Sequence, residues 1–182
     1  MKKISLVIAA LFLAQLSFSQ QKGIPEMKFQ KGIGKIDFLP INMPNNEADM
    51  GFTGMHYNIF LNDFAYAGLG IYGAVSGIRG GFFTLGVNAG IKKFITYNLY
   101  TDFGFHYGGG GGAGAPDGGG IFIKPHVNLG YQFKNFGINT GWSYVNFFDG
   151  GEIKSHQLNV AVEIPLNYEY ADFDASENEY NF

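Results

Sequence analysis

The chain has 182 residues, enough for one domain of ordinary size, and 15% of them are charged, against about 25% in ordinary soluble domains. It contains no cysteine, which argues against a lipoprotein anchor, disulfides and thiolate chemistry. Twelve basic residues stand against fifteen acidic ones, so the basic patch that nucleic-acid binding needs is not indicated. Glycine (28 residues) and aromatic residues (17%) are abundant instead.

Residues 1–20 have the three marks of a signal peptide. Lys2 and Lys3 form a positive start, an uncharged apolar run covers 4–16, and small residues follow at Ser17 and Ser19. The run of about 13 residues is short for a membrane-spanning helix, which needs roughly 20. We therefore expect cleavage near residues 19–21 and export of the remaining chain.

After this leader, residues 21–168 show the period-two alternation of β-strands rather than a helical pattern. Eight alternating segments can be distinguished, at 28–39, 51–61, 64–75, 82–91, 97–107, 121–133, 137–148 and 157–168. In the first segment the apolar parity switches between Ile33 and Ile36, which predicts a β-bulge. The sequence therefore predicts an all-β fold.

The connections between the segments alternate in length. Short polar links are expected at 62–63, 92–93 and 134–135, and longer loops at 40–49, 76–81, 108–120 and 149–152. Short turns at one end and longer loops at the other are typical of outer-membrane barrels. Strands of about 10–14 residues are long enough to cross a bilayer at a tilt.

Alternation alone is compatible with two kinds of barrel, because a soluble lipocalin-like barrel also alternates but places its apolar face inside. Its outer face should then be rich in lysine and glutamate, whereas the polar face here is mostly glycine, asparagine, threonine and tyrosine. Small polar groups suit the narrow lumen of an eight-stranded barrel. We therefore assign Val127 and Val160 to lipid, and Asn128 and Asn159 to the lumen.

Aromatic residues gather toward the ends of the apolar faces, as an interfacial girdle would. These are Tyr97, Tyr107, Tyr131, Trp142, Tyr144 and Tyr168.

By this pattern, the chain resembles the small bacterial outer-membrane β-barrels over 21–168. The resemblance implies an antiparallel up-and-down transmembrane barrel of about eight strands in the outer membrane, surrounded by its lipids, with both termini in the periplasm. It also implies insertion by the barrel-assembly machinery, which reads a last strand like 160–168. Residues 169–182, with five acids and no base, depart from the family as an acidic C-terminal tail.

We interpret as structural two features whose types bind cofactors or metals in other proteins. The glycine tract 108–120 lacks the Lys-Ser or Lys-Thr and the helix of a phosphate-binding loop, so we expect a surface loop. His56, His106 and His126 share the lumen parity but have no metal-ligand spacing. We expect them to form hydrogen bonds in the lumen, and we predict neither a metal nor a cofactor site.

A polar belt is the main candidate site. Hairpin pairing would place Asp102 opposite His126, His126 opposite Ser143, and Ser143 opposite Asn159. Asp102, His126 and Ser143 then stand in the order of an acid–base–nucleophile set. We interpret them as a structural network rather than a catalytic triad, with Lys124 and Glu163 as further inward charges.

A second candidate is Ser155-His156, near the outer end of the last strand. It is similar to the histidine–serine pair of lipid A deacylases, although the order and spacing differ from their His-x-Ser-Asn motif. We expect a non-enzymatic outer-membrane barrel that contributes to envelope structure or surface interaction. The alternatives are a lipid-modifying barrel enzyme and a small pore or uptake channel. No protein partner or ligand is indicated beyond lipid and the assembly machinery.

Overall fold

The computed structural model describes residues 26–116, 120–148 and 150–172. The predicted signal peptide, glycine-loop residues 117–119 and tail residues 173–182 lie outside the described residues.

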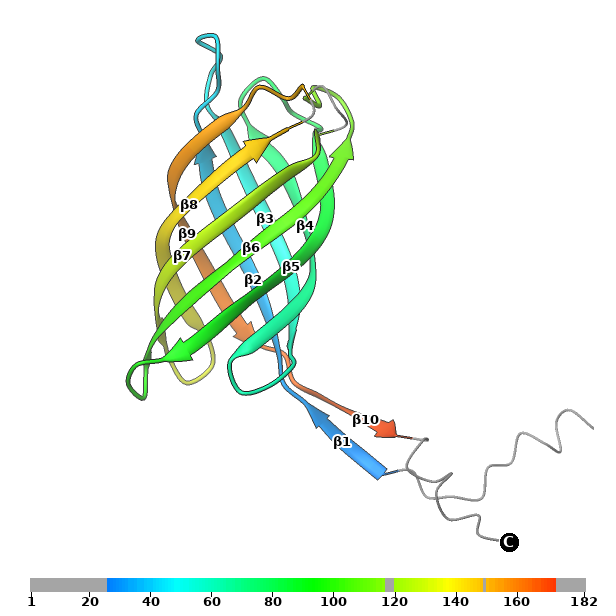
Figure 1. Cartoon of the computed structure of the whole chain (residues 1–182), viewed down its shortest axis with the longest axis vertical. Coiled ribbons are helices and arrows are strands. Elements are labelled where there is room, and N and C mark those ends of the chain that lie inside the picture. The colour runs from blue at the N-terminus through cyan, green and yellow to red at the C-terminus, as the bar shows by residue number, and fades with distance from the viewer. Residues whose placement is uncertain (1–25, 117–119, 149, 173–182) are drawn as a thin grey trace, which may run out of the picture. The chain divides into compact units, whose positions relative to one another are not determined.

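Eight antiparallel strands close into a barrel in chain order, and the last strand pairs with the first (Figure 1). The strands are β2 (Gly32–Ile41), β3 (Met50–Phe60), β4 (Ala65–Ser76), β5 (Phe83–Phe94), β6 (Leu99–Gly111), β7 (Phe122–Gln132), β8 (Gly137–Phe147) and β9 (Lys154–Pro165). The predicted up-and-down, eight-stranded architecture is confirmed.

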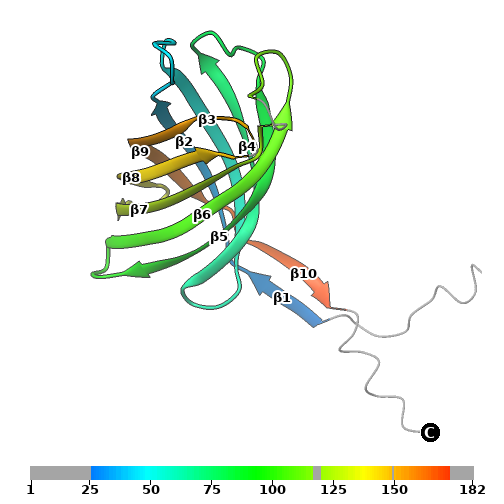
Figure 2. The same cartoon turned by 45° about the horizontal axis from the view of Figure 1, so that its top comes forward.

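Short connections lie at one end of the barrel and the longer loops at the other, as Figures 1 and 2 show. Two of the predicted boundaries are wrong. Lys92 and Lys93 lie within β5, and the turn follows at 95–98. Residues 108–111 belong to β6, because their glycine backbone continues the ladder with β5 as far as the pair Gly111–Phe83.

The predicted β-bulge in the first segment is also wrong. The register between β2 and β3 is continuous from Gly32 to Ile41. Lys31 separates β2 from a shorter strand before it, and the register shift of this region lies instead between Gly51 and Phe52 of β3. The apparent change of parity arises because apolar residues of β2 also face inward near its ends.

The two faces of the wall are arranged as predicted, with polar residues inside. Val127 and Val160 point outward and are 44% and 51% exposed, whereas Asn128 and Asn159 are 2% and 1% exposed. The large apolar residues of β2–β9 that alternate with the lumen positions are mostly exposed on the outer wall. The barrel therefore presents an apolar outer surface around a polar interior.

An apolar cluster occupies the lumen at its loop end. Its members come from the loop ends of the strands and from the loops: Leu39, Ile41, Met50, Phe52, Tyr72, Phe82, Phe122, Val145, Phe147 and Ile153. Aromatic rings stack within it, with centroids 5.7 Å apart for Phe52 and Phe82 and 4.9 Å apart for Phe122 and Phe147. The cluster fills this end of the lumen with close-packed side chains.

A separate two-stranded sheet pairs β1 (Glu26–Gln30) with β10 (Tyr168–Asp172), so the segment predicted as a tail begins within a strand. Lys28 forms an ion pair with Asp172, and this hydrogen bond and charge raise the pKa of Lys28 above its ordinary value. The described residues include no helix of the length and apolarity needed to cross a membrane.

Candidate functional site

The polar interior of the barrel contains a balanced set of charges. Among the described residues, three lysines and three carboxylates are buried: Lys35, Lys92, Lys124, Asp37, Asp102 and Glu163. A buried charge is costly unless it is paired and hydrogen-bonded. Each of the three carboxylates meets this need in a similar way.

Asp102 is the first of these centres. Its Oδ2 atom accepts a hydrogen bond from Lys35 Nζ at 3.0 Å and lies 3.2 Å from His126 Nε2. Its Oδ1 atom accepts from the Tyr66 hydroxyl at 2.7 Å. One lysine, one tyrosine and one histidine therefore surround this carboxylate.

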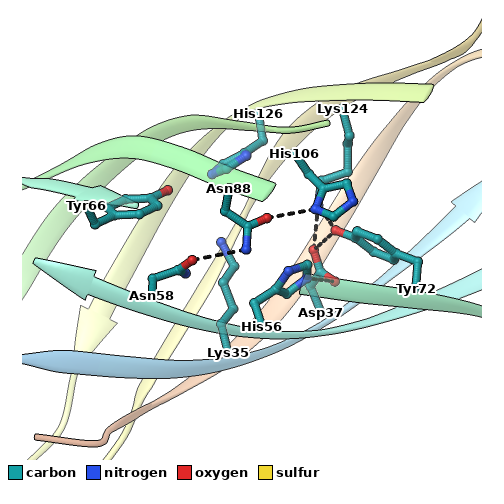
Figure 3. Close-up of a pocket in the computed structure, with 10 residues that line it drawn as sticks. All are labelled: Lys35, Asp37, His56, Asn58, Tyr66, Tyr72, Asn88, His106, Lys124 and His126. Carbon is teal, nitrogen blue, oxygen red and sulfur yellow. Dashed lines mark hydrogen bonds and ion pairs between the residues drawn. The ribbon is translucent and has the colours of Figure 1, made fainter. Parts of the chain in front are cut away.

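Asp37 repeats the same set of partners (Figure 3). Its Oδ2 atom accepts from Lys124 Nζ at 2.5 Å and from the Tyr72 hydroxyl at 2.7 Å. Its Oδ1 atom lies 3.2 Å from His56 Nε2. The carboxylate is again matched by one lysine and shielded by one aromatic hydroxyl.

Glu163 is the third centre, with an amide in place of the histidine. Its Oε2 atom accepts from Lys92 Nζ at 2.5 Å and from the Tyr100 hydroxyl at 2.9 Å. Asn139 Nδ2 donates to Oε1 at 2.8 Å. Lys92 also lies over the ring of Tyr100, 3.8 Å from its centroid, which adds a cation–π contact.

Two of the lysine–carboxylate ion pairs join strands that face each other across the ring. Lys35 of β2 and Asp102 of β6 stand four places apart in a barrel of eight strands, as do Lys92 of β5 and Glu163 of β9. The side chains therefore bridge the lumen rather than line one wall.

Amide and imidazole groups continue the network between these centres. Asn88 Nδ2 donates to Asn58 Oδ1 at 3.0 Å, and Asn88 Oδ1 accepts from His106 Nδ1 at 2.7 Å, as Figure 3 shows. The cavity among these side chains has a volume of about 10 Å³, no more than the space of a single water molecule. The middle of the lumen is therefore filled by its own side chains.

The structure brings Asp102 and His126 together, but not through the register expected from the sequence. Asp102 pairs with Asn128, two residues from the predicted partner, and His126 pairs with Gly104. The contact is diagonal, which long side chains can span on a sheet.

Ser143 pairs with His126 as predicted, but its other predicted partner is wrong, since Gln157 rather than Asn159 lies opposite it. Its Oγ atom accepts from Gln157 Nε2 at 3.1 Å, and the residue is 0% exposed. Among the described residues, His126 Nδ1 has no hydrogen-bond partner. The three residues therefore share one belt without the hydrogen-bond relay from acid through base to nucleophile that a triad requires.

Ser155 and His156 point to opposite faces of β9. Ser155 is buried in the barrel, where its Oγ accepts from the backbone N–H of Asn42 at 2.9 Å. His156 is exposed on the outer wall, between the rings of Trp142 and Tyr144. The two side chains cannot act on one substrate from these positions.

Several members of the network were not identified from the sequence: Lys35, Asp37, Tyr66, Tyr72 and Lys92. The available signal was parity. Tyr66 and Tyr72 alternate in step with Gly68 and Gly70, and small residues at these positions leave room for large inward side chains from neighbouring strands. A tyrosine on a face otherwise made of glycine is a candidate for the lumen.

No protein-family model matches the chain, and no curated protein matches it. Among solved structures, one from the de novo design of transmembrane β-barrels is 12% identical, with a TM-score of 0.50, covering 79% of this chain and all of the designed one. The outer membrane protein Ail of Yersinia pestis, in a phospholipid bilayer nanodisc, is 14% identical with a TM-score of 0.48, covering 75% and 99%. The chain has the closed eight-stranded fold of the small outer-membrane barrels.

Proposed function

We propose that the chain is a non-enzymatic β-barrel of the outer membrane, contributing to envelope structure or surface interaction. Residues 1–20 would direct its export, the barrel-assembly machinery would insert it, and outer-membrane lipids would surround its apolar wall. The designed transmembrane barrel with the same fold supports this location.

The observation that carries the proposal is the filled lumen inside an apolar wall. Lys35 and Asp102 bridge the lumen, the remaining cavity is about 10 Å³, and the apolar cluster fills the loop end. A solute path would require these groups to separate, leaving buried charges unpaired at a cost of several kcal/mol. The filled lumen therefore favours a role in envelope structure or surface interaction over transport.

Fractionation and conductance test the proposal together. The exported chain should appear in the outer membrane, beginning near residues 20–22, and its folded state should be heat-modifiable on a gel. In planar bilayers the refolded barrel should give no conductance steps, with a porin as the positive control for the assay. Recovery as a soluble periplasmic protein contradicts the location, and single-channel steps support the pore alternative.

The alternative of a lipid-modifying enzyme has a separate outcome. Incubation of the refolded barrel with outer-membrane lipids should leave every acyl ester intact. Release of fatty acid that disappears in Ser143→Ala or His156→Gln would overturn the non-enzymatic proposal and identify the nucleophile or base.

A further inference from the structure

The outer wall of the barrel carries basic side chains at only three positions. Among the described outward-facing residues of β2–β9, these are Lys93, Lys154 and His156, and none of the outward positions bears a carboxylate. Ionisable groups on a lipid-facing surface are costly and usually functional. Lys93 lies next to the end of β5 at the short turns, whereas Lys154 and His156 lie together at the loop end of β9.

His156 stands in an aromatic setting formed by β8. It lies opposite Tyr144, with ring centroids 4.5 Å apart, and it stacks on Trp142 with centroids 5.5 Å apart and planes inclined by 26°. Lys154, two residues earlier on the same face, lies opposite Asn146. The neighbouring strand thus orients the imidazole beside an exposed ammonium group.

Neither basic group is neutralised within the described part of the chain. The ion pairs formed there involve other lysines, histidines and the arginine, and they include neither Lys154 nor His156. An ammonium ion and an imidazole about two residues apart, with no carboxylate on the same wall, favour an anion with several acceptor oxygens.

The surface beside this pair indicates that the anion belongs to a lipid. Leu158 follows His156 on the same face toward the middle of the barrel and is 72% exposed, and Trp142 lies directly opposite Leu158 on β8. Tryptophan and tyrosine are enriched where the apolar core of a bilayer meets its headgroups. A ligand that contacts all of these residues needs an anionic head and an apolar chain.

We propose that Lys154 and His156, beside Trp142 and Tyr144, bind the phosphate of an anionic lipid headgroup at the loop end of the barrel. This inference rests on the proposed function, because it requires the outer wall to face lipid. The occupant would be a phosphate-bearing lipid of the leaflet in which the loop end of the barrel lies.

Trp142 makes the site directly observable, because it is the only tryptophan in the chain. The full mature chain is refolded into phosphatidylcholine vesicles containing a small fraction of brominated lipid, either phosphatidic acid or phosphatidylcholine. Bromine quenches a neighbouring indole, so the ratio of the two quenching efficiencies measures the preference for the anionic phosphate headgroup over the zwitterionic phosphocholine headgroup. We expect brominated phosphatidic acid to be enriched about fivefold at Trp142, since one lysine near a membrane surface contributes about that factor.

The double variant Lys154→Gln/His156→Gln should lower this ratio to one while leaving the barrel folded. Lys93→Gln is the matched control, because it removes one outward lysine at the opposite end, and it should leave the ratio unchanged. Inorganic phosphate added at millimolar concentration should not displace the lipid.

The possible failures are distinguishable. Equal quenching by both lipids in the folded wild-type barrel overturns the headgroup site alone. An equal fall of the ratio in Lys93→Gln indicates general electrostatic attraction and also overturns the site. Displacement by inorganic phosphate means that the site binds a free anion, which overturns the lipid as its occupant. Absence of quenching by either lipid means that Trp142 does not face lipid, which overturns the proposed function itself.

Discussion

Lys35 and Asp102 are joined directly across the barrel, with Nζ and Oδ2 3.0 Å apart, although their strands stand on opposite sides of the ring. Lys35 also lies 4.0 Å from Glu163 Oε1, which connects the Asp102 centre with the Glu163 centre. Lys35, Asp102, Glu163 and Lys92 therefore form a connected, electrically balanced set rather than two isolated pairs. Removal of one charged side chain should destabilise the barrel more than removal of that side chain together with its partner.

The pair Lys35–Asp102 provides the first prediction. Asp102→Asn should destabilise the barrel by about 3–5 kcal/mol, because it leaves the Lys35 ammonium group buried without its main counter-charge. Lys35→Met in the same chain should restore part of the loss. Urea unfolding of the wild type, the two single variants and the double variant in vesicles measures the coupling energy between the two side chains. Losses that simply add would contradict a direct interaction.

The contact between Asp102 and His126 should also be structural. Asp102→Ala and His126→Ala should each lower the melting temperature, and the double variant should lose less than the sum of the two, because both changes remove the same 3.2 Å contact. Thermal unfolding of the refolded barrel measures this. Additive losses would mean that the carboxylate gains its stability from Lys35 and Tyr66 alone.

Two adjacent lysines allow a matched comparison. Lys92 is buried against Glu163, whereas Lys93 faces outward near the turn. Lys92→Met should cost about 3–5 kcal/mol of unfolding free energy through the unpaired glutamate. Lys93→Met should change it by no more than about 0.5 kcal/mol, as is usual for exposed positions. Equal effects of the two changes in chemical denaturation would contradict the assigned faces.

Gly130 leaves space for a side chain that the network requires. A Cβ atom at this position would lie 2.2 Å from Tyr100 Cζ and 2.6 Å from its hydroxyl oxygen, which donates to Glu163. Gly130→Ala should therefore displace the tyrosine and cost about 1–3 kcal/mol. Gly73→Ala is the control, because a Cβ atom there has no neighbour within 4 Å. Similar denaturant midpoints for both variants would disprove the steric role.

The direction of each side chain could be predicted from the sequence because alternation is local. Asn128 and Asn159 were assigned to the lumen from their immediate neighbours, and both are buried there. Register depends instead on where a strand ends. In the glycine run at 108–111 no side chains alternate, so the sequence does not indicate where β6 ends. The predicted partner of Asp102 was therefore wrong by two residues.

Alternation is also uninformative where both faces are apolar. Phe52, Phe82 and Phe147 lie inside the loop end of the lumen, among outward apolar residues of the same strands and loops. Composition cannot separate these two sets. Lys92 was predicted in an exposed turn, because two adjacent lysines are typical of one. It is buried because Glu163 lies across the lumen and pairs with it.

The orientation of the wall leads to the last prediction. The chain has no cysteine, so single cysteines can be introduced without background thiols. Val127→Cys and Val160→Cys replace residues that are about half exposed on the outer wall, and Asn128→Cys and Asn159→Cys replace their buried neighbours. In vesicles, a lipid-soluble maleimide should label the first pair rapidly and leave the second pair unlabelled.

The same two positions also allow an energetic test. Arginine at Val127 or Val160 should cost about 2–4 kcal/mol of folding free energy if the residue lies near the middle of the bilayer. The cost should be smaller in detergent micelles, where water reaches the wall more easily, so the difference between the two media isolates the lipid contribution. Faster labelling at Asn128→Cys and Asn159→Cys, together with arginine costs that do not depend on the medium, would indicate a water-exposed wall and contradict the membrane orientation.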